Sequence, residues 1–220
     1  ASNGEYWHFV SDGGYEKPEY WTETGWRWRS FRNVKHPTFW VPVSNSEVHQ
    51  YKLRTCFEIV PMQWNWPVVV NFHEAVAFSK WKSAQDGMTY RLLSEAEHHA
   101  LRASTHADGD EQRWVPPSPA NTNLRWGAES PVDAALTDKT SVADVFGNVW
   151  QWCEDPSHPL EGFLTHPLYA DFSTPCFDGE HQMILGGSFV STGDEASSWA
   201  RFHFRPHFFQ HAGIRLITTL

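Results

Sequence analysis

The stretch from Leu185 to Leu216 constrains the fold of this chain more than any other part of the sequence. It opens with Gly186-Gly187, closes with Gly213-Ile214-Arg215-Leu216, and is dense in aromatic, histidine and arginine residues between those ends. Glycines beside an apolar run mark tight turns that other residues make only at a cost. A segment that is both aromatic and cationic forms either a buried interface or the wall of a pocket.

Helices are predicted where capping residues precede apolar residues at helical spacing. Residues 2–5 form a capping box, and the helix behind it is ended by Asp12-Gly13-Gly14. Residues 94–97 form a second box, which predicts a helix that ends near Ala103. Between them, the clearest apolar periodicity predicts a helix over residues 73–84.

The remaining segments are predicted to be short strands and irregular loops. Apolar and aromatic runs bounded by turn residues indicate the strands. Polar stretches rich in Pro, Asn and Asp indicate the loops. We expect strands at 51–60, 66–70 and 147–152, aromatic loop with a short strand at 20–42, and long loops at 104–141 and 154–179.

Aromatic side chains, more than regular structure, are expected to hold this chain together. It has 13 Trp and 15 Phe among 14 Pro and 14 Gly. Its 220 residues suffice for a sizeable core, and neither an internal repeat nor a linker divides them. We therefore expect one domain over residues 1–220. Because the first helix begins almost at once, we also expect this domain to follow or lie within a larger chain.

The charge balance and hydropathy argue against several classes of function. Lys and Arg total 17 against 26 for Asp and Glu, so the formal charge is −9, which disfavours a nucleic-acid-binding protein. Mean hydropathy is −0.51, and no apolar run reaches membrane-spanning length. Three scattered cysteines form no disulfide framework and no signal peptide is visible, so we expect a reducing, cytoplasmic location.

Four segments resemble a known family in the correct order. RLLSEAEHHAL, FGNVWQW, LGGSF and GIRL are similar to the signature segments of the formylglycine-generating-enzyme, or sulfatase-modifying-factor, fold. The resemblance implies an α+β fold, related to C-type lectins, with short antiparallel strands, few helices and much ordered loop.

Within that family, longer stretches resemble the central domain of 5-histidylcysteine sulfoxide synthases of ovothiol biosynthesis, which are related to the ergothioneine sulfoxide synthases. These stretches include DGGYEKPEYWTETGWRWRSFRNVKHPTFWVP, PMQWNWPVVVNFHEAVAF and HPLYADFSTP. The resemblance implies a non-haem Fe(II) enzyme that uses dioxygen to join the cysteine sulfur to the histidine imidazole. It also implies partners in the parent chain: an N-terminal DinB-like domain that supplies the iron ligands, and in many members a C-terminal methyltransferase domain.

Two other readings stay open at this point. The chain resembles the ergothioneine-type enzymes as well, which act on a histidine derivative. The fold also includes C-type-lectin-like modules that bind ligands without catalysis. The His-x-x-x-His-x-Glu iron motif of the family is absent from this sequence, so we expect no metal ligands here, and finding the motif elsewhere in the parent protein would favour an enzyme.

Tyr169 is the catalytic candidate that the resemblance implies. An active-site tyrosine lies on the loop before the Gly-Gly-Ser segment in the sulfoxide synthases, and residues 168–173 resemble that loop. A phenol suits the role because it supplies a proton or a hydrogen atom yet stays neutral at pH 7. The alternative is a loop tyrosine that only packs its ring.

Phe202, His203 and Arg205 are the candidate substrate-binding residues. Phe202-His203 stands where the ergothioneine enzymes carry a Trp-Asp pair, and Arg205 offers a bidentate fork for a carboxylate, or is a solvated arginine. His203, His207 and His211 recur every four residues, but Pro206 would break a helix that aligned them, so we expect no metal site from them.

Further residues bear on the metal sites of the family and on thiol chemistry. The copper-binding cysteines of formylglycine-generating enzymes fall on Ser191 and Ala196 here, which argues against that activity. Asn148 lies where some relatives bind calcium, but the nearby acidic residue is Gln151, so we expect that site to be weakened. For Cys153 and Cys176 we identify no activating base, so we expect ordinary thiols.

Overall fold

The computed structural model describes residues 1–43, 50–105, 120–134, 142–197 and 199–218. In these ranges, no helix is long and apolar enough to cross a membrane. The helices are α1 (Asn3–Ser11), α2 (Glu23–Arg32), α3 (Phe72–Asp86), α4 (Glu95–Thr105) and α5 (Ala170–Ser173), with 3₁₀ turns η1 (Pro18–Tyr20), η2 (Pro167–Tyr169), η3 (Thr174–Cys176) and η4 (Gly193–Ala196). The strands are β1 (Trp40–Pro42), β2 (Tyr51–Arg54), β3 (Ile59–Pro61), β4 (Tyr90–Leu92), β5 (Trp150–Pro156), β6 (Gln182–Leu185), β7 (Phe202–Phe204), β8 (Ala212–Gly213) and β9 (Leu216–Thr218).

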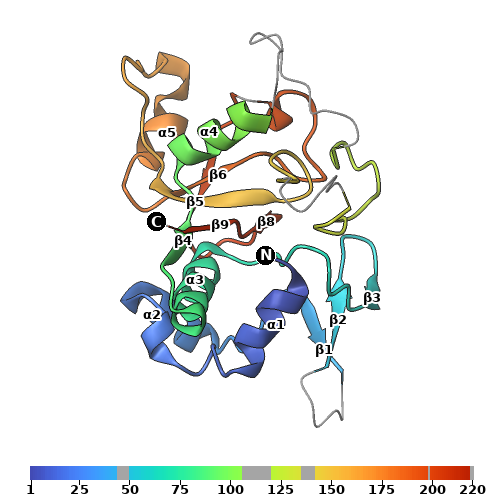
Figure 1. The fold of residues 1–220 in the computed structure, drawn as a ribbon. Helices are drawn as coiled ribbons and strands as arrows, with labels where there is room; N and C mark the ends of the chain where they lie inside the picture. The colour runs from blue at the N-terminus through green and yellow to red at the C-terminus, as the bar shows by residue number, and fades with distance from the viewer. Residues whose placement is uncertain (44–49, 106–119, 135–141, 198, 219–220) are drawn as a thin grey trace.

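The described strands form three small sheets, in agreement with the predicted α+β fold. The main sheet has the order β7-β6-β5-β8, in which only the β5–β8 pair is parallel. A two-stranded sheet joins β4 to β9, and a hairpin meander joins β1, β2 and β3. Figure 1 shows β5 and β6 in one half of the molecule, α1, α2 and α3 in the other, and β4, β8 and β9 between them.

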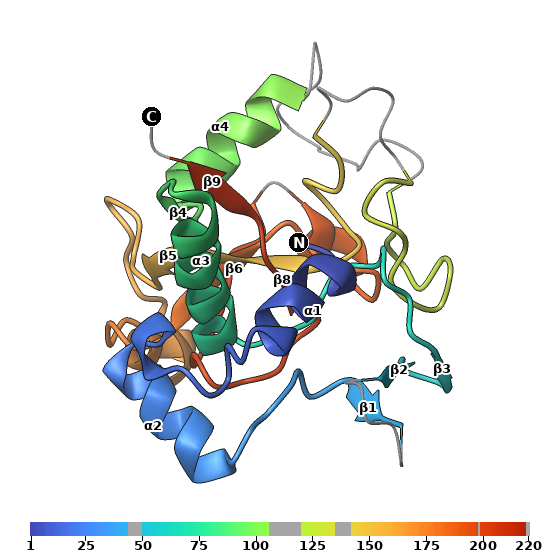
Figure 2. The same cartoon turned by 60° about the horizontal axis from the view of Figure 1, so that its bottom comes forward.

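The largest core lies around α1 and α3, and its side chains are mostly aromatic. Both α1 and α2 pack against α3 (Figure 2). The Tyr6 ring stacks on Phe78 with 5.1 Å between centroids, and both side chains are fully buried together with Phe9. The Tyr15 hydroxyl donates to Glu74 Oε1 at 2.6 Å, so the one carboxylate in this core has a partner. This confirms that aromatic side chains hold the chain together.

Capping residues place the predicted helices correctly. Both predicted boxes form: Glu5 N donates to Ser2 Oγ at 3.2 Å, and Glu97 N donates to Ser94 Oγ at 3.2 Å. The helix expected over 73–84 runs from Phe72 to Asp86, because Asn71 caps it and Gly87 ends it in the left-handed region. The cap at Asn71 was not foreseen.

The helix α2 was wrongly predicted to be loop and short strand. Trp26 and Trp28 alternate with arginines, a spacing of two that hides any helical period. The capping residues determine this helix instead. Thr22 caps its start by accepting a hydrogen bond from Gly25 N at 3.0 Å, and Asn33 ends it in the left-handed region, with a φ of 49°.

Three strand predictions need correction. Residues 51–60 form β2, a turn and part of β3, because Thr55 N bonds to Glu58 O at 2.9 Å and closes a hairpin. Residues 66–70 are buried but pair in no ladder beyond one bridge at Pro67, because their amides bond to two separate segments of the chain. The strand expected at 147–152 starts only at Trp150, because Gly147 and Asn148 have φ values of 74° and 63°.

The motifs that carry the family resemblance interlock around the main sheet. The Arg215 guanidinium donates to Gln151 Oε1 at 2.5 Å and to the carbonyls of Ala143 and Asp144. Arg201 binds the buried Glu95 carboxylate through two nitrogens, at 2.5 and 2.9 Å. Segments far apart in the sequence are thus joined by buried or half-buried polar contacts.

Candidate functional site

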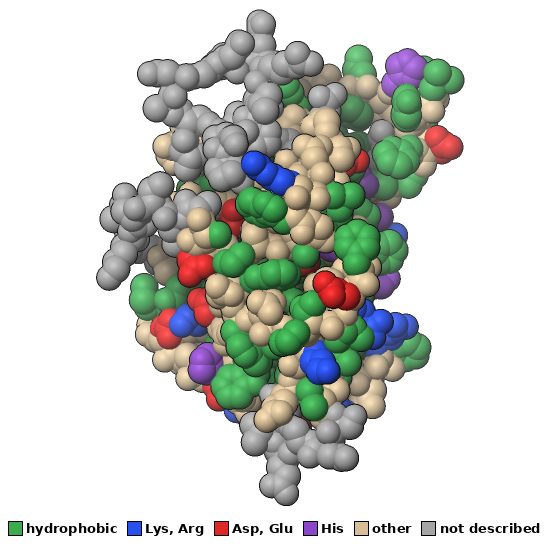
Figure 3. All heavy atoms as spheres, turned by 90° about the vertical axis from the view of Figure 1, so that its right-hand side faces the viewer, with side chains coloured by type: hydrophobic (Ala, Val, Ile, Leu, Met, Phe, Trp, Pro, Cys, Tyr) green, Lys and Arg blue, Asp and Glu red, His purple; other side chains and the backbone are tan. Residues whose placement is uncertain are grey.

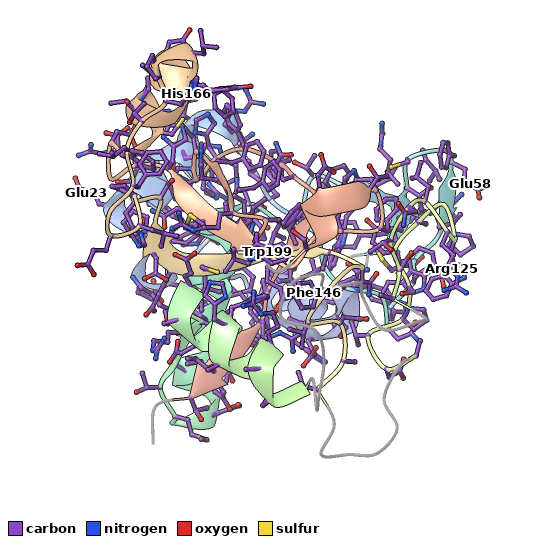
Figure 4. All side chains as sticks on the ribbon, turned by 90° about the horizontal axis from the view of Figure 1, so that it is seen from above. Glu23, Glu58, Arg125, Phe146, His166 and Trp199 are labelled. Carbon is purple, nitrogen blue, oxygen red and sulfur yellow. The ribbon has the colours of Figure 1, made fainter. Side chains whose placement is uncertain are left out.

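The candidate site lies on the excursion from the main sheet between β5 and β6, residues 157–181. This β5–β6 excursion contains η2, α5 and η3. In Figure 4 its His166 stands at one end of the molecule, Glu58 and Arg125 lie at the other, and Trp199 lies between them. Most of its large apolar side chains are exposed, among them Leu164, Leu168 and Phe172. The expected loop over 154–179 therefore has short helical turns, and its apolar side chains face solvent.

Tyr169 ends η2 with its phenol toward solvent. Its side chain is 59% exposed, and its ring lies 6.0 Å from the His166 ring. His166 fixes this turn, because its Nδ1 accepts from Leu168 N at 3.2 Å and its carbonyl accepts from Tyr169 N at 2.8 Å. The backbone of Tyr169 is therefore held while its hydroxyl stays accessible to another group.

Asp178 ties the end of the excursion back to the sheet. Its Oδ1 accepts from the backbone amides of Glu180 and His181, at 2.8 and 3.1 Å, and lies 3.0 Å from His181 Nδ1. The Arg205 guanidinium donates to Asp178 Oδ2 at 3.2 Å and also pairs with Glu180. The His181 contact, followed by the backbone hydrogen bonds, holds the pKa of Asp178 well below its usual range. Arg205 is therefore an ion-paired side chain, not a free cation.

His203 meets the excursion from the middle of the edge strand β7. Its ring lies 5.4 Å from the His181 ring, nearly perpendicular to it. One ligand atom each from Cys176, His181 and His203 lie within 4.8 Å of one another, and no other such group of His, Cys or acidic residues is found in the described part of the chain. Burial, then the charge of His181, lowers the pKa of His203, and burial with Asp178 raises that of the Cys176 thiol.

The four predicted site residues do not form one pocket. Successive side chains of a strand point to opposite faces, so His203 and Phe202 diverge. Phe202 packs on the Trp150 ring at 5.1 Å and lines a hollow of about 350 Å³ with Trp199. His203 and Arg205 instead share the face that meets the β5–β6 excursion.

A second hollow lies beside this face, between α2 and the segment after β7. It has a volume of about 620 Å³ and is lined by Trp28, Phe31, Arg32, His207, Phe208, Phe209 and Gln210. The His73 ring lies 5.7 Å from the Trp28 ring and is tilted against it, and burial followed by the charge of His207 lowers the pKa of His73 to about 4. Sequence reasoning missed this hollow because its two walls come from distant segments.

The other histidines of the repeated spacing lie apart from His203. His211 packs against Phe189 and lies 3.8 Å from both Cys56 Sγ and Glu129 Oε1. His207 packs on Phe208 at the second hollow. The face that carries β3 and residues 120–134 shows apolar side chains interspersed with both charges (Figure 3).

Asn148 and Ser191, where the resemblance implies metal sites in other members of the family, make structural hydrogen bonds here. The Asn148 amide donates to Ser130 O and Asp144 Oδ2 and accepts from Ser130 N. Ser191 Oγ accepts from Ser188 N at 3.0 Å and closes the turn after the paired glycines. Both side chains are thus used to hold loops.

The described residues do not fit a non-haem Fe(II) centre. Such centres use imidazoles with a carboxylate and keep open positions. The group at the excursion offers a thiol in place of the carboxylate, and Asp178 is already held by His181 and Arg205. The described residues are therefore not assigned as iron ligands.

One known family matches the whole chain. The family model described as sulfatase-modifying factor enzyme 1-like domain matches residues 1–220.

Curated relatives are longer than this chain. Hercynine oxygenase of Mycobacterium tuberculosis is 29% identical over 86% of this chain, and that of Mycolicibacterium smegmatis is 31% identical over 86%. This chain spans 44% of the length of each. Ergothioneine biosynthesis protein 1 of Schizosaccharomyces pombe is 23% identical over 98% of this chain, which spans 24% of that protein.

Solved structures share the fold at low sequence identity. The PvdO protein of Pseudomonas aeruginosa aligns with a TM-score of 0.55 at 20% identity, covering 88% of this chain and 75% of its own. The variable protein 1 of Treponema denticola aligns with a TM-score of 0.56 at 18% identity, covering 86% and 79%. These similarities confirm the predicted fold class.

Proposed function

Because the chain belongs to the family of sulfatase-modifying factor enzyme 1-like domains, we propose that it is the substrate-pocket domain of a dioxygen-dependent, non-haem iron sulfoxide synthase. The reaction we assign to the whole protein joins the sulfur of cysteine to the imidazole carbon of histidine, as in ovothiol biosynthesis. The observation that carries the proposal is the similarity, over most of this chain, to proteins named hercynine oxygenase.

Iron belongs to another part of the parent protein in this proposal. The described residues lack the donor set, and the chain spans 44% of the hercynine oxygenases it matches. We therefore assign the iron ligands to an N-terminal DinB-like domain. When bound there, the metal supplies the activation of dioxygen. The domain described here supplies the face against which histidine and cysteine are held, and a C-terminal methyltransferase domain is a further expected partner.

Tyr169 is the proton donor in this proposal. Its phenol is exposed, its backbone is fixed by His166, and it lies on the excursion that returns to the sheet beside His203. A phenol is protonated at neutral pH and transfers its proton only to a strongly basic centre.

The proposed substrate contacts are His203, Arg205 and Phe202. Their side chains differ in how freely they can reach a substrate. Arg205 reaches a substrate carboxylate only by exchanging Asp178 or Glu180 for it. Its neighbour His203 has a buried Nδ1 with no hydrogen-bond partner in the described part of the chain. Phe202 contributes from the other face of β7 through the hollow next to Trp199.

The substrate is histidine itself in our proposal, and hercynine is the second candidate because the curated relatives carry that name. Competition between histidine, its trimethylated form and cysteine analogues in the full-length enzyme distinguishes the two. Preferential turnover of the trimethylated form would show that hercynine, and not histidine, is the substrate.

Replacement of Tyr169 by Phe in the full-length enzyme tests the catalytic assignment. The variant keeps the ring and loses the acidic proton, so we expect C–S coupling to fall about 100-fold while oxidation of cysteine alone rises. Tyr20→Phe, which removes a phenol beside the aromatic core, is the matched control. Product analysis by mass spectrometry measures both outcomes. Unchanged product ratios in Tyr169→Phe would remove Tyr169 from the mechanism and leave the assignment of the domain intact.

A further inference from the structure

Cys176, His181 and His203 come from three separate pieces of backbone. Cys176 ends η3, His181 precedes β6, and His203 lies in β7 opposite Met183. The antiparallel β6–β7 register brings the two histidines together, and η3 adds the thiol from the excursion. Their ligand atoms lie within 4.8 Å of one another. The ligands of a tetrahedral metal ion are separated by distances of this order.

The acidic residue Asp178 already orients one of these side chains as a metal ligand requires. Its carboxylate oxygens lie 3.0 and 3.1 Å from His181 Nδ1, and Arg205 holds the same carboxylate at 3.2 Å. A carboxylate on one imidazole nitrogen fixes the tautomer and leaves the other nitrogen, Nε2, with its lone pair outward. Metal-binding histidines are held in this way in most known sites.

The second imidazole has a buried nitrogen that the described protein does not satisfy. Nδ1 of His203 is inaccessible and has no hydrogen-bond partner in the described part of the chain. Leaving such an atom unpaired costs free energy. A cation bound at this nitrogen and shared with His181 and Cys176 would remove that cost.

We propose that Cys176, His181 and His203 bind a zinc-class divalent cation. One sulfur and two nitrogen donors suit Zn²⁺ and disfavour Mg²⁺ and Ca²⁺, which take oxygen ligands. Binding releases one proton, because the Cys176 thiol coordinates as a thiolate. With that thiolate the site has a net charge of +1, next to the carboxylates of Asp178 and Glu180. The three ligand residues are half-buried.

The consequence for the molecule is a further connection between the β5–β6 excursion and the sheet. Without the cation, Asp178 and its hydrogen bonds make the connection at the end of the excursion. With it, Cys176 is fixed to β7, and Tyr169 lies seven residues upstream of that ligand. The cation thereby orders the segment that carries Tyr169, whether or not the proposed reaction is correct.

Titration of the purified 220-residue chain with Co²⁺ tests the site. Co²⁺ replaces Zn²⁺ and reports a thiolate ligand through a sulfur-to-cobalt charge-transfer band. We expect one equivalent to bind with that band, and Zn²⁺ to displace it. Absence of the band at excess Co²⁺ would overturn the proposal.

Variants locate the ligands. Cys176→Ser should abolish the band, His181→Gln and His203→Gln should weaken binding at least 100-fold, and Asp178→Asn should weaken it about 10- to 100-fold. Cys56→Ser and His158→Gln, a thiol and an imidazole outside the cluster, should bind as the parent chain does. Circular dichroism and cooperative melting confirm that each variant is folded. A band that survives in folded Cys176→Ser, or is lost in Cys56→Ser, would contradict the assignment.

Discussion

The aromatic core around α1 and α3 and the β5–β6 excursion contain the same kinds of side chain in opposite environments. In the core, Tyr6 and Phe9 are fully buried, and their rings contact Phe78 at 5.1 and 6.2 Å. On the excursion, Phe172 is 70% exposed and Leu164 is 88% exposed. Aromatic and apolar content therefore does not determine which segment stabilises the fold. The regular structure around the segment determines it, because capped helices surround the core, whereas the excursion has only short turns.

The largest difference between the two regions should follow removal of a ring. Phe9→Ala leaves a cavity among rings that cannot collapse, so we expect the free energy of unfolding to fall by about 3–5 kcal/mol. Phe172→Ala, on the excursion, should change it by no more than about 0.5 kcal/mol. Urea unfolding monitored by tryptophan fluorescence measures both. Equal losses would show that the excursion is part of the cooperative core.

One pH-dependent contribution to stability should arise from Glu74 in the core. Burial raises the pKa of Glu74 from 4.5 to about 7, against the opposing hydrogen bonds from Tyr15 and Asn71. Because the folded chain then holds the proton more tightly than the unfolded chain, this contribution is fully present below pH 4.5 and is lost as the pH rises through about 7. The span corresponds to about 3 kcal/mol.

Glu74→Gln checks this assignment, because the amide cannot titrate. The variant lacks the contribution that falls between pH 4.5 and about 7. Chemical unfolding at a series of pH values from 4 to 8 should therefore show stability that falls less, or rises more, with pH in the variant than in the parent chain. An unchanged slope would place the titrating group elsewhere.

A smaller effect should distinguish the two regions through their glycines. A Cβ at Gly14 would lie 2.1 Å from the Phe9 ring, so Gly14→Ala should cost about 1–3 kcal/mol through overpacking. Gly162, on the excursion, has a φ of 78° and nothing within 4 Å of its Cβ position. Gly162→Ala should therefore cost only the left-handed strain of about 1 kcal/mol. Thermal unfolding measures the loss of stability in each variant. A larger loss for Gly162→Ala than for Gly14→Ala would contradict the packing described for Phe9.

The sequence predicted those parts of the fold that are determined locally. The helices α1 and α4 follow from capping boxes that are complete within four residues. The helix α2 could not be predicted, because its period is masked by the alternation of Trp and Arg. The buried run at Val68–Val70 could not be distinguished from a strand, because its hydrogen bonds go to Ala1 and Ala212.

The candidate site was predictable only in part. Tyr169 was identified by resemblance to a family loop, and its role stays a prediction. Cys176 and His181 were not singled out as ligands, because the spacings of 5 and 22 residues between them and His203 match no local motif. Only the pairing of β6 with β7 brings them together. The opposite directions of Phe202 and His203 could be anticipated only once β7 was known to be a strand.

The pairing of β4 with β9 and of β5 with β8 has a consequence for how the protein folds. Leu92 pairs with Leu216, and Gln151 pairs with Gly213. These contacts join residues that are distant in sequence, so chain closure slows folding. During translation, the edges of β4 and β5 stay without these partners until residues 212–218 emerge from the ribosome. Over that interval the nascent chain exposes unpaired strand edges, which are the kind of surface that favours aggregation.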